Sequence, residues 1–371
     1  MKKIGITGQS GFIGYHLYQY LRLQKKQVQL IDFKDQYFED EGQLSRFVGS
    51  CDVIVHLAGM NRHGDPQVIY DTNIRLAHQL TNAADRVGAK PHILFSSSTQ
   101  EERDNPYGKS KREARLWLAN WAAQKGVKFT GFVIPNVFGP FGNPFYNSVI
   151  ATFSHQIASG QNPKIDIDAE MKLIYVNNLV EIIYQNCISE DSKSEVFVNH
   201  MASYKVTEVL SKLVDFKETY MDKGVIPELP EYFDVCLFNT FRCYMNPAHY
   251  PFYLKNNQDN RGSLFEAIKT NTKGQMFFST THPGIIRGNH FHRRKIERFC
   301  VVKGEAVIRL RRVGTSEIIE YPVSGDKPSF IDMPVYHTHN ITNTGNSELL
   351  TIFWANEFFN TNDPDTYFEE V

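Results

Sequence analysis

The chain has 371 residues, too many for one hydrophobic core of ordinary size, so two domains are expected. Its 40 Lys and Arg residues almost balance its 41 Asp and Glu residues, and neither sign forms a long run. This balance argues against nucleic-acid binding and against binding to a charged membrane surface. A small molecule is the expected partner.

The five cysteines are odd in number and scattered, without a CxxC pair of the kind that binds zinc or acts in redox chemistry. They are therefore expected to be reduced thiols. The chain runs from Met1 directly into a predicted strand, and no apolar stretch approaches membrane length. We expect a soluble, cytoplasmic protein that does not enter a membrane.

From residue 4 to about residue 137, short β-branched runs alternate with helical stretches. The predicted strands are KKIGITG, VQLID, VIVHLAG, HILFSSS and KFTGFVIP, and helices are predicted over residues 16–23, 72–87 and 110–124. This alternation predicts an α/β fold, a Rossmann-type doubly wound parallel sheet. Less regular helical segments follow at residues 146–159, 176–187 and 207–216.

Prolines, asparagines and tyrosines interrupt any periodicity over residues 246–260, so we place the boundary between domains 1–245 and 246–371 here. Beyond it come GQMFFSTT, ERFCVVKG, AVIRLRRV, SEIIEYPV, SFIDMP, HNITNT and ELLTIFWANE, separated by Gly or Asn turns. Such a series of short strands predicts an all-β sandwich or barrel.

Gly8, Gly11 and Gly14 lie in TGQSGFIG, directly after the first predicted strand and at the start of a helix. Such a turn lets backbone N–H groups approach a pyrophosphate, whose negative charge the helix N-terminus favours. Asp32 ends the second strand, where a carboxylate can bind the adenosine ribose hydroxyls of NAD. Lys34 can instead meet the 2′-phosphate of NADP. Alternatively, Asp32 only caps the end of the strand.

Tyr107 and Lys111 lie four residues apart in YGKSK, after a predicted strand that ends at Ser98. On a helix they face the same side, so the ammonium group can lower the pKa of the phenol and hold the nicotinamide ribose. Ser98 would then hydrogen-bond the substrate carbonyl. Alone, the YxxxK pattern also fits an exposed helix with an aromatic anchor.

These motifs make the first 240 residues resemble the extended short-chain dehydrogenase/reductase family, which includes sugar-nucleotide epimerases, dehydratases and reductases. The matching segments are TGQSGFIG, HLAG, DTNIRLAHQL, FSSS, YGKSK, PNVFGP and IYVNNLV. The resemblance implies that Tyr107 donates a proton, that Ser98 assists it, and that the dinucleotide contacts Gly8, Gly11, Gly14, Asp32, Tyr107 and Lys111. Because only nine positions separate Ser98 from Tyr107, either Ser98 or Ser97 can face the substrate.

A second candidate site lies in GIIRGNHFHRRKIERFCVVKG. His290 and His292 share one face if this segment is a strand, and Glu297 returns from the neighbouring turn, so all three can reach one metal ion. Nitrogen and oxygen ligands suit zinc, iron, manganese or nickel. The alternative is that these are ordinary surface or core side chains.

This segment is similar to the first motif of the cupin family, and PVYHTHNITN resembles the second. On the family's spacing the last metal ligand falls at His339, while His337 is either a competing ligand or an acid/base candidate. A charged nucleotide sugar could contact other polar or aromatic residues of the barrel, each of which could equally be surface or core: Arg261, Arg287, Tyr321 and Trp354.

As a whole, the chain resembles bifunctional enzymes of capsular-polysaccharide synthesis in the UDP-N-acetyl-L-fucosamine pathway. The resemblance implies that a zinc-bearing cupin epimerises C3 of a UDP-2-acetamido-2,6-dideoxy-4-hexulose. The N-terminal domain would then reduce the C4 ketone with NADPH, giving UDP-N-acetyl-6-deoxy-talosamine. A homodimer is expected, because members of both families are usually oligomeric. The alternatives are a nucleotide-sugar 4-epimerase or dehydratase with a structural barrel, and a non-catalytic NAD(P)- or sugar-sensing protein.

Overall fold

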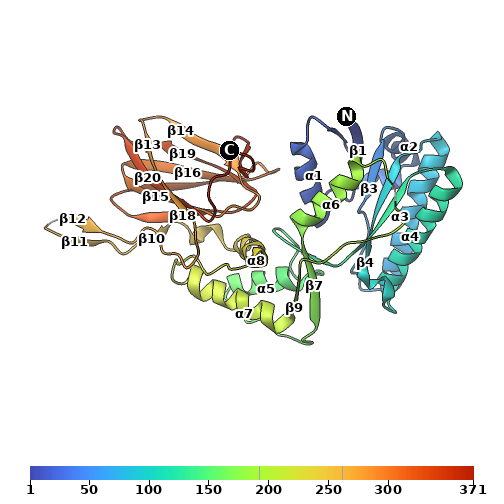
Figure 1. Ribbon diagram of the computed structural model, residues 1–371, viewed down its shortest axis with the longest axis horizontal. Helices are drawn as coiled ribbons and strands as arrows, with labels where there is room; N and C mark the ends of the chain where they lie inside the picture. Colours follow the sequence, from blue (N-terminus) through green and yellow to red (C-terminus); the bar gives the residue numbers. More distant parts are fainter. Residues whose placement is uncertain (192, 261) are drawn as a thin grey trace. The chain divides into compact units, whose positions relative to one another are not determined.

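The computed structural model describes residues 1–191, 193–260 and 262–371, so Arg261 lies outside the described residues. The chain folds into two compact units (Figure 1). Unit 1 comprises Met1–Phe138, Gly142–Val149 and Glu170–Tyr204, and unit 2 comprises Gly139–Phe141, Ile150–Ala169 and Lys205–Val371. Unit 2 thus contains segments that precede residue 246, and the domain boundary at 245/246 stays a prediction.

Unit 1 is built on a parallel sheet of six strands, which confirms the predicted fold class. The strand order is β2-β1-β3-β4-β5-β8. These strands are β1 (Lys2–Thr7), β2 (Val28–Ile31), β3 (Val53–His56), β4 (His92–Ser98), β5 (Phe129–Ile134) and β8 (Val196–Phe197). The order reverses between β1 and β3, and doubly wound sheets bind ligands at such a switch point, beyond the carboxyl ends of the strands.

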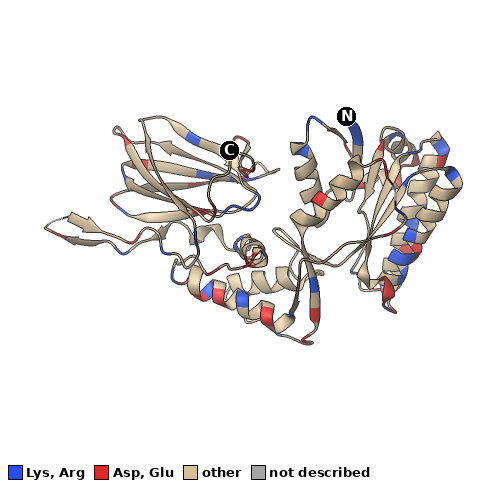
Figure 2. Ribbon diagram, in the orientation of Figure 1, with Lys and Arg blue, Asp and Glu red and all other residues tan. Residues whose placement is uncertain are grey.

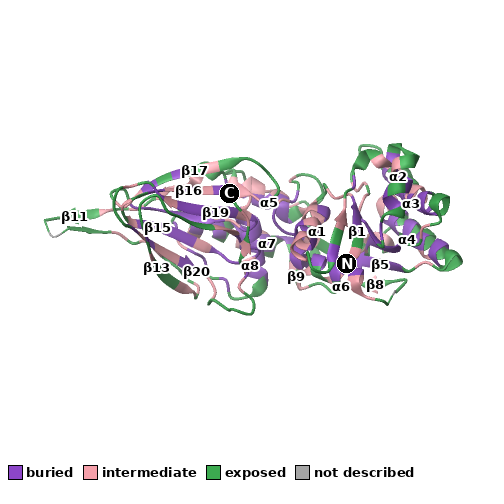
Figure 3. Cartoon of the chain, turned by 90° about the horizontal axis from the view of Figure 1, so that it is seen from above, coloured by how far each residue is buried: buried purple, intermediate pink, exposed green. Residues whose placement is uncertain are grey.

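Helices cover both faces of this sheet, and its central strands are buried (Figure 3). Leu80 and Leu118 belong to the core on one face, and Leu17 and Leu179 to the core on the other. The helices are α1 (Phe12–Leu23), α2 (Glu41–Gly49), α3 (Pro66–Val87), α4 (Pro106–Lys125) and α6 (Val176–Ile188). A small second sheet, in the order β6-β7-β9, contains β6 (Asn136–Phe138), β7 (Glu170–Tyr175) and β9 (Ala202–Lys205).

Helices α3 and α4 begin several residues earlier than the apolar periodicity predicted. Asp65 and Asn105 are N-caps whose side chains accept hydrogen bonds from Gln67 N and Gly108 N, and a proline follows each of them at the first helical position. Asp and Asn are favoured N-caps, and proline loses no hydrogen bond at that position. The first turns of these helices are therefore determined by capping residues and not by apolar spacing.

Unit 2 contains two five-stranded antiparallel sheets that form the predicted barrel. Their orders are β10-β18-β15-β20-β13 and β17-β16-β19-β14-β21. Phe299 and Ile331 from the first sheet share one core with Ile308 and Ile341 from the second. The strands are β10 (Phe252–Tyr253), β13 (Gln275–Thr281), β14 (Ile286–Phe291), β15 (Glu297–Lys303), β16 (Glu305–Arg312), β17 (Ile318–Ser324), β18 (Ser329–Met333), β19 (His337–Asn343), β20 (Leu349–Ala355) and β21 (Tyr367–Phe368).

The remaining elements are helical segments and one hairpin. The helices are α5 (Val149–Ala158), α7 (Val206–Phe216) and α8 (Tyr232–Arg242), and the short helical turns are η1 (Asp35–Glu39), η2 (Thr99–Glu102), η3 (Lys217–Met221) and η4 (Pro247–His249). The hairpin joins β11 (Asn257–Asp259) to β12 (Gly262–Leu264). The sequence did not predict α2 or α8.

Charges of both signs are interspersed along the helices, as α7 shows in Figure 2. All five cysteines are free thiols. Among the described residues, no helix combines the length and the apolar character that crossing a membrane would require.

Candidate active site and metal centre

The glycine loop after β1 is packed so closely that two of its positions exclude any side chain. A Cβ atom on Gly8, whose φ is +72°, would lie 2.7 Å from the backbone N of Ala58, and one on Gly14 would lie 2.2 Å from the carbonyl oxygen of Gly8. Helix α1 begins after Gly11, which has no side chain to cap it. The N–H groups of this helix start are therefore left for an anionic ligand such as a pyrophosphate.

Asp32 and Lys34 follow β2, which pairs in parallel with β1. Both side chains are exposed at the edge of the sheet that also carries the glycine loop. Ser10 in that loop donates a hydrogen bond to the Asp35 carboxylate at 3.1 Å. The structure thus brings the segment after β2 to the glycine loop. There, Asp32 could bind the adenosine ribose hydroxyls of NAD, or Lys34 could bind the 2′-phosphate of NADP.

Ser98 and Tyr107 are brought together although they lie on different elements. Ser98 ends β4, Tyr107 is in the first turn of α4, and the Ser98 side chain is close enough to the phenol to lower its pKa by hydrogen bonding. The neighbouring Ser97 instead donates to the carboxylate of Glu101. Of the two serines that the sequence left open, Ser98 is therefore the one that reaches the phenol.

Lys111 is buried beside these residues, and its Nζ atom donates to the carbonyl oxygen of Ser96 at 2.8 Å. Burial lowers the pKa of Lys111 to about 8. Burial also raises the pKa of Tyr107 to about 12, although the hydrogen bond from Ser98 acts in the opposite direction. The predicted lowering of the phenol pKa is therefore wrong for this structure, because desolvation of the phenolate outweighs any stabilisation of it.

Two further groups hold this region in place, and the sequence did not assign roles to them. The Asn73 side chain accepts from Met60 N at 2.7 Å and donates to Met60 O and to Ser110 Oγ, each at 2.9 Å. Glu101 binds the Arg115 guanidinium in a bidentate manner at 2.7 and 2.8 Å. Asn73 lies in a segment that matches the extended reductase family, but no spacing rule links Glu101 to Arg115.

The candidate metal ligands come together in unit 2. One ligand atom from each of His290, His292, Glu297 and His339 lies within 4.8 Å of the others. His290 and His339 are direct register partners on β14 and β19, next to a bulge at Asn289, whose φ is +60°. Such a bulge redirects the side chains that follow it. The group includes His339 and not His337.

The donor atoms of this group fit a divalent metal. The Nε2 atoms of His292 and His339 lie 3.0 and 3.5 Å from Oε2 of Glu297. Both are buried, and apart from this carboxylate neither has a hydrogen-bond partner among the described residues. The Nδ1 atoms face the carbonyl oxygens of Asp365 and His337, at 2.5 and 3.2 Å. Metal-binding histidines are commonly oriented in this way, with one ring nitrogen on a carbonyl and the other on the metal.

The pKa shifts of His290 and Glu297 favour the forms of these residues that bind metal ions. Burial and the neighbouring imidazoles lower the pKa of His290 to about 3. Although burial opposes it, His292 and His339 hold the pKa of Glu297 well below its ordinary value. A neutral imidazole and an ionised carboxylate are the forms that bind metal ions.

The other barrel residues that the sequence suggested as contacts of a nucleotide sugar differ in their exposure. Tyr321 is buried and its hydroxyl donates to the carbonyl oxygen of Pro247 at 3.1 Å. Trp354 is also buried, whereas Arg287 is exposed on β14. Tyr321 and Trp354 therefore contribute to packing of the barrel.

Comparison with known proteins also distinguishes an N-terminal part of the chain from a C-terminal part. Residues 4–198 match the NAD dependent epimerase/dehydratase family, and residues 257–367 match the Polysaccharide biosynthesis C-terminal domain. The chain therefore belongs to the NAD dependent epimerase/dehydratase family, in an arrangement that adds this C-terminal domain. The sequence-based resemblance to capsular-polysaccharide enzymes is confirmed.

Two relatives match over essentially the whole chain. The UDP-2-acetamido-2,6-beta-L-arabino-hexul-4-ose reductase of Pseudomonas aeruginosa is 31% identical over 368 residues, which is 98% of each sequence. The capsular polysaccharide assembling protein CapF from Staphylococcus aureus is 37% identical, with a TM-score of 0.63 and full coverage of both chains. RMD from P. aeruginosa, solved with NADPH, covers 59% of this chain and 83% of its own at 22% identity and a TM-score of 0.54, a likeness of fold.

Proposed function

We propose that the chain is a bifunctional nucleotide-sugar enzyme of capsular-polysaccharide synthesis. The barrel would epimerise C3 of a UDP-2-acetamido-2,6-dideoxy-4-hexulose, and unit 1 would reduce the C4 ketone with NADPH to UDP-N-acetyl-6-deoxy-talosamine. The observation that carries this proposal is the occurrence of two complete side-chain groups in one chain, one for reduction and one for metal binding. The full-length relative named as a 4-hexulose reductase supports it.

In the reductase site, NADPH, when bound, would supply the hydride for reduction at C4. Tyr107 donates the proton to the ketone oxygen, since its phenol, with a pKa of about 12, is protonated at neutral pH. Ser98, which lies beside this phenol, would donate its own hydroxyl proton to a hydrogen bond with the same ketone oxygen. Lys111, with a pKa of about 8, is still an ammonium ion at pH 7 and offsets the phenolate charge that forms.

We place the adenosine 2′-phosphate at Lys34, because its ammonium group is exposed at the sheet edge beside the glycine loop. Asp32 at the same edge favours NAD by charge, so the preference for NADPH rests on the reductive direction of the reaction and on Lys34. The comparison of kcat/KM for NADPH and NADH tests this choice. A Lys34→Ala substitution is expected to reduce the preference for NADPH.

In the barrel, His290, His292, Glu297 and His339 would hold a divalent metal, proposed to be zinc. When bound, it supplies the Lewis acid that makes a carbon next to a ketone acidic. His337 is the proposed base for the C3 proton. Burial lowers the pKa of His337 to about 4, so the imidazole is neutral at pH 7. A hydrogen bond from Nδ1 to Val335 O, at 3.1 Å, would make Nε2 the proton acceptor.

We infer that the active form is a homodimer. β13 is the edge strand of its sheet, and the exposed fractions of Met276 and Phe278 on it are 56% and 69%. A long apolar edge of this kind is usually covered by another chain. Light scattering on the purified protein should give twice the mass of the chain, and Phe278→Lys should shift the mass toward that of a monomer.

The test of the main proposal is to mix the protein with the UDP-4-hexulose and NADPH in D2O, and to follow NADPH absorbance and the sugar by NMR. Deuterium at C3 together with NADPH consumption supports both activities. NADPH oxidation without exchange would leave the barrel as a structural part. Tight retention of the nicotinamide through the turnover would indicate a 4-epimerase or dehydratase, and no reaction at all would favour a sensor.

A further inference from the structure

The geometry points to Asp365, near the C-terminus, as the positioning residue of the proposed metal centre. We propose that it holds both His292 and the loop that separates His292 from Glu297. Two of the four ligands are then oriented by the C-terminal tail, the segment after β20 (residues 356–371). This inference rests on the metal centre of the proposed function. Nothing in the spacing of the ligand motif points to a residue 73 positions beyond His292.

The first contact is made by the main chain of Asp365. Its carbonyl oxygen lies 2.5 Å from Nδ1 of His292, so Nδ1 carries the proton and donates to it. When the imidazole is neutral, Nε2 of His292 is then the unprotonated nitrogen that can bind a metal, and that atom lies 3.0 Å from Oε2 of Glu297. The carbonyl of Asp365 thus determines which ring nitrogen faces the other ligands.

The second contact is made by the Asp365 carboxylate. Oδ1 accepts from Arg293 N at 3.1 Å, and Oδ2 accepts from Arg294 N and Lys295 N, each at 2.9 Å. Three successive N–H groups that converge on one anion form a backbone nest. The fourth residue of the loop, Ile296, donates its N–H to Asn356 Oδ1 at 2.9 Å. Every backbone N–H between the two ligands is therefore bound by the tail.

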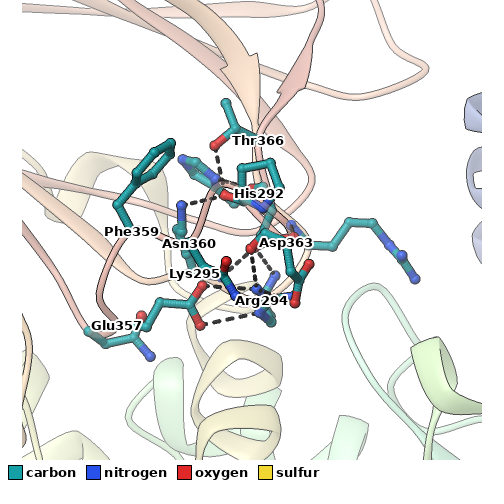
Figure 4. Close-up of polar contacts among 12 residues, drawn as sticks. His292, Arg294, Lys295, Glu357, Phe359, Asn360, Asp363 and Thr366 are labelled. Atoms are coloured by element: carbon teal, nitrogen blue, oxygen red, sulfur yellow. Dashed lines mark hydrogen bonds and ion pairs between the residues drawn. The ribbon is translucent and has the colours of Figure 1, made fainter.

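Other residues of the tail, among them Glu357 and Asp363, contact the side chains of the same loop (Figure 4). The Arg294 guanidinium binds Glu357 at 3.1 and 3.2 Å and Asp363 at 3.0 and 3.1 Å. The Lys295 ammonium donates to the carbonyl oxygen of Pro364 at 2.5 Å. Beyond Asp365, β21 pairs with β14 at His290 itself. A third ligand therefore also lies against the tail.

The backbone at Asp365 adopts a conformation that few residues tolerate. Its φ is +43°, and its side chain is almost fully buried, with 2% of the residue exposed. Asp, Asn and Gly are the residues that most readily adopt this left-handed region. Asn or Gly at this position would keep the backbone conformation and the carbonyl contact, while the charged double acceptor would be lost. These two substitutions therefore isolate the carboxylate.

The experiment measures the zinc affinity of the full-length protein and of Asp365→Asn by competition with a chromophoric chelator. The thermal midpoints of unfolding of the two zinc-free proteins are compared as well. Substitution of residues that orient metal ligands commonly weakens metal binding by about 10- to 100-fold, and we expect a loss in that range. The matched control is Asp363→Asn, because Asp363 binds only the Arg294 side chain among the loop groups and is largely exposed. Asp365→Gly serves as a second variant if Asp365→Asn does not fold.

The outcomes separate this inference from the proposed metal centre. If the unmodified protein binds no zinc, the metal centre is wrong and Asp365 has nothing to position. If it binds zinc and the folded Asp365 variants bind equally well, the positioning role is wrong even where the zinc-free thermal midpoint falls. A loss as large in Asp363→Asn would also overturn it, because the tail as a whole would then be responsible. The visible spectrum of the Co2+-loaded proteins should change in the Asp365 variants and stay unchanged in the control.

Discussion

Arg298 and Asp332 form a bidentate ion pair in the interior of unit 2. The Nε–Oδ1 and Nη2–Oδ2 distances are 2.7 and 2.8 Å, and the two side chains are only 1% and 0% exposed. Tyr220 donates to the same carboxylate at 2.7 Å, and Arg298 Nη1 donates to Gly224 O at 2.7 Å. The pair thus joins β15 and β18 of the barrel to the segment after α7.

We expect Asp332→Ala to be strongly destabilising. The substitution removes the carboxylate that accepts from Nε and Nη2 of the buried Arg298 guanidinium and from the Tyr220 hydroxyl. Removing one partner of a buried pair typically costs about 3–5 kcal/mol in the free energy of unfolding. Differential scanning calorimetry should show a clear fall in the midpoint of the transition that contains the barrel.

The control for this prediction is an exposed ion pair in the same barrel. Arg309 Nε lies 2.6 Å from Glu320 Oε1, with side chains that are 30% and 56% exposed. Because exposed pairs contribute about 0–1 kcal/mol, Glu320→Ala should leave the midpoint almost unchanged. Equal effects of Glu320→Ala and Asp332→Ala would contradict a special role for burial.

The cysteines should be unreactive in the native protein at pH 8. Burial raises the pKa of Cys300 to about 11 and those of Cys51 and Cys243 to about 12. It also raises the pKa values of Cys187 and Cys236. At pH 8, a thiol with a pKa near 11 is ionised in only about one molecule in a thousand, and the thiolate is the reactive form. Reaction with Ellman's reagent should therefore be slow before guanidinium is added and should reach five thiols afterwards. Prompt release of one equivalent from the native protein would contradict this prediction.

The phenol of Tyr107 should be required for reduction but not for proton exchange at C3. Tyr107→Phe removes the proposed proton donor and leaves the barrel unchanged, so NADPH oxidation should slow by about 100- to 10,000-fold. Deuterium incorporation next to the ketone should continue at the unmodified rate. The two rates are measured in the same D2O reaction.

Tyr70→Phe is the matched control, because the hydroxyl of Tyr70 donates to Glu113 across the α3–α4 pair and is outside the proposed site. It should keep both rates. If Tyr107→Phe abolished exchange as well as reduction, the two activities would not be independent.

The fold could be predicted from the sequence wherever one local rule determined it. Each predicted barrel strand appears within a residue or two, because β-branched alternation and Gly or Asn turns are local signals. α2 and α8 were missed. In α8, Tyr232–Arg242, nearly every position is buried, so no polar face produces the periodicity of an amphipathic helix.

In the candidate sites, the sequence predicted which residues lie together only where those residues are near each other in the chain. Tyr107 and Lys111 share one helix, and His290 and His292 are two residues apart, so their proximity followed from geometry. Asp365 reaches His292 only through the path of the C-terminal tail, which no local pattern encodes. The direction of the Tyr107 pKa shift was also missed, because it depends on burial by the rest of the unit.

His292 should be required for metal binding and for exchange at C3. His292→Ala removes one proposed ligand and leaves the other three, so the purified variant should lose bound zinc. Because the Lewis acid contributes several kcal/mol to proton removal, deuterium exchange should slow by at least about 100-fold. His282→Ala, an exposed histidine at the end of β13, is the control and should keep both metal and exchange. A folded His292→Ala protein that exchanges deuterium at the unmodified rate would show that the histidine and glutamate cluster is not the epimerisation site, whatever metal it binds.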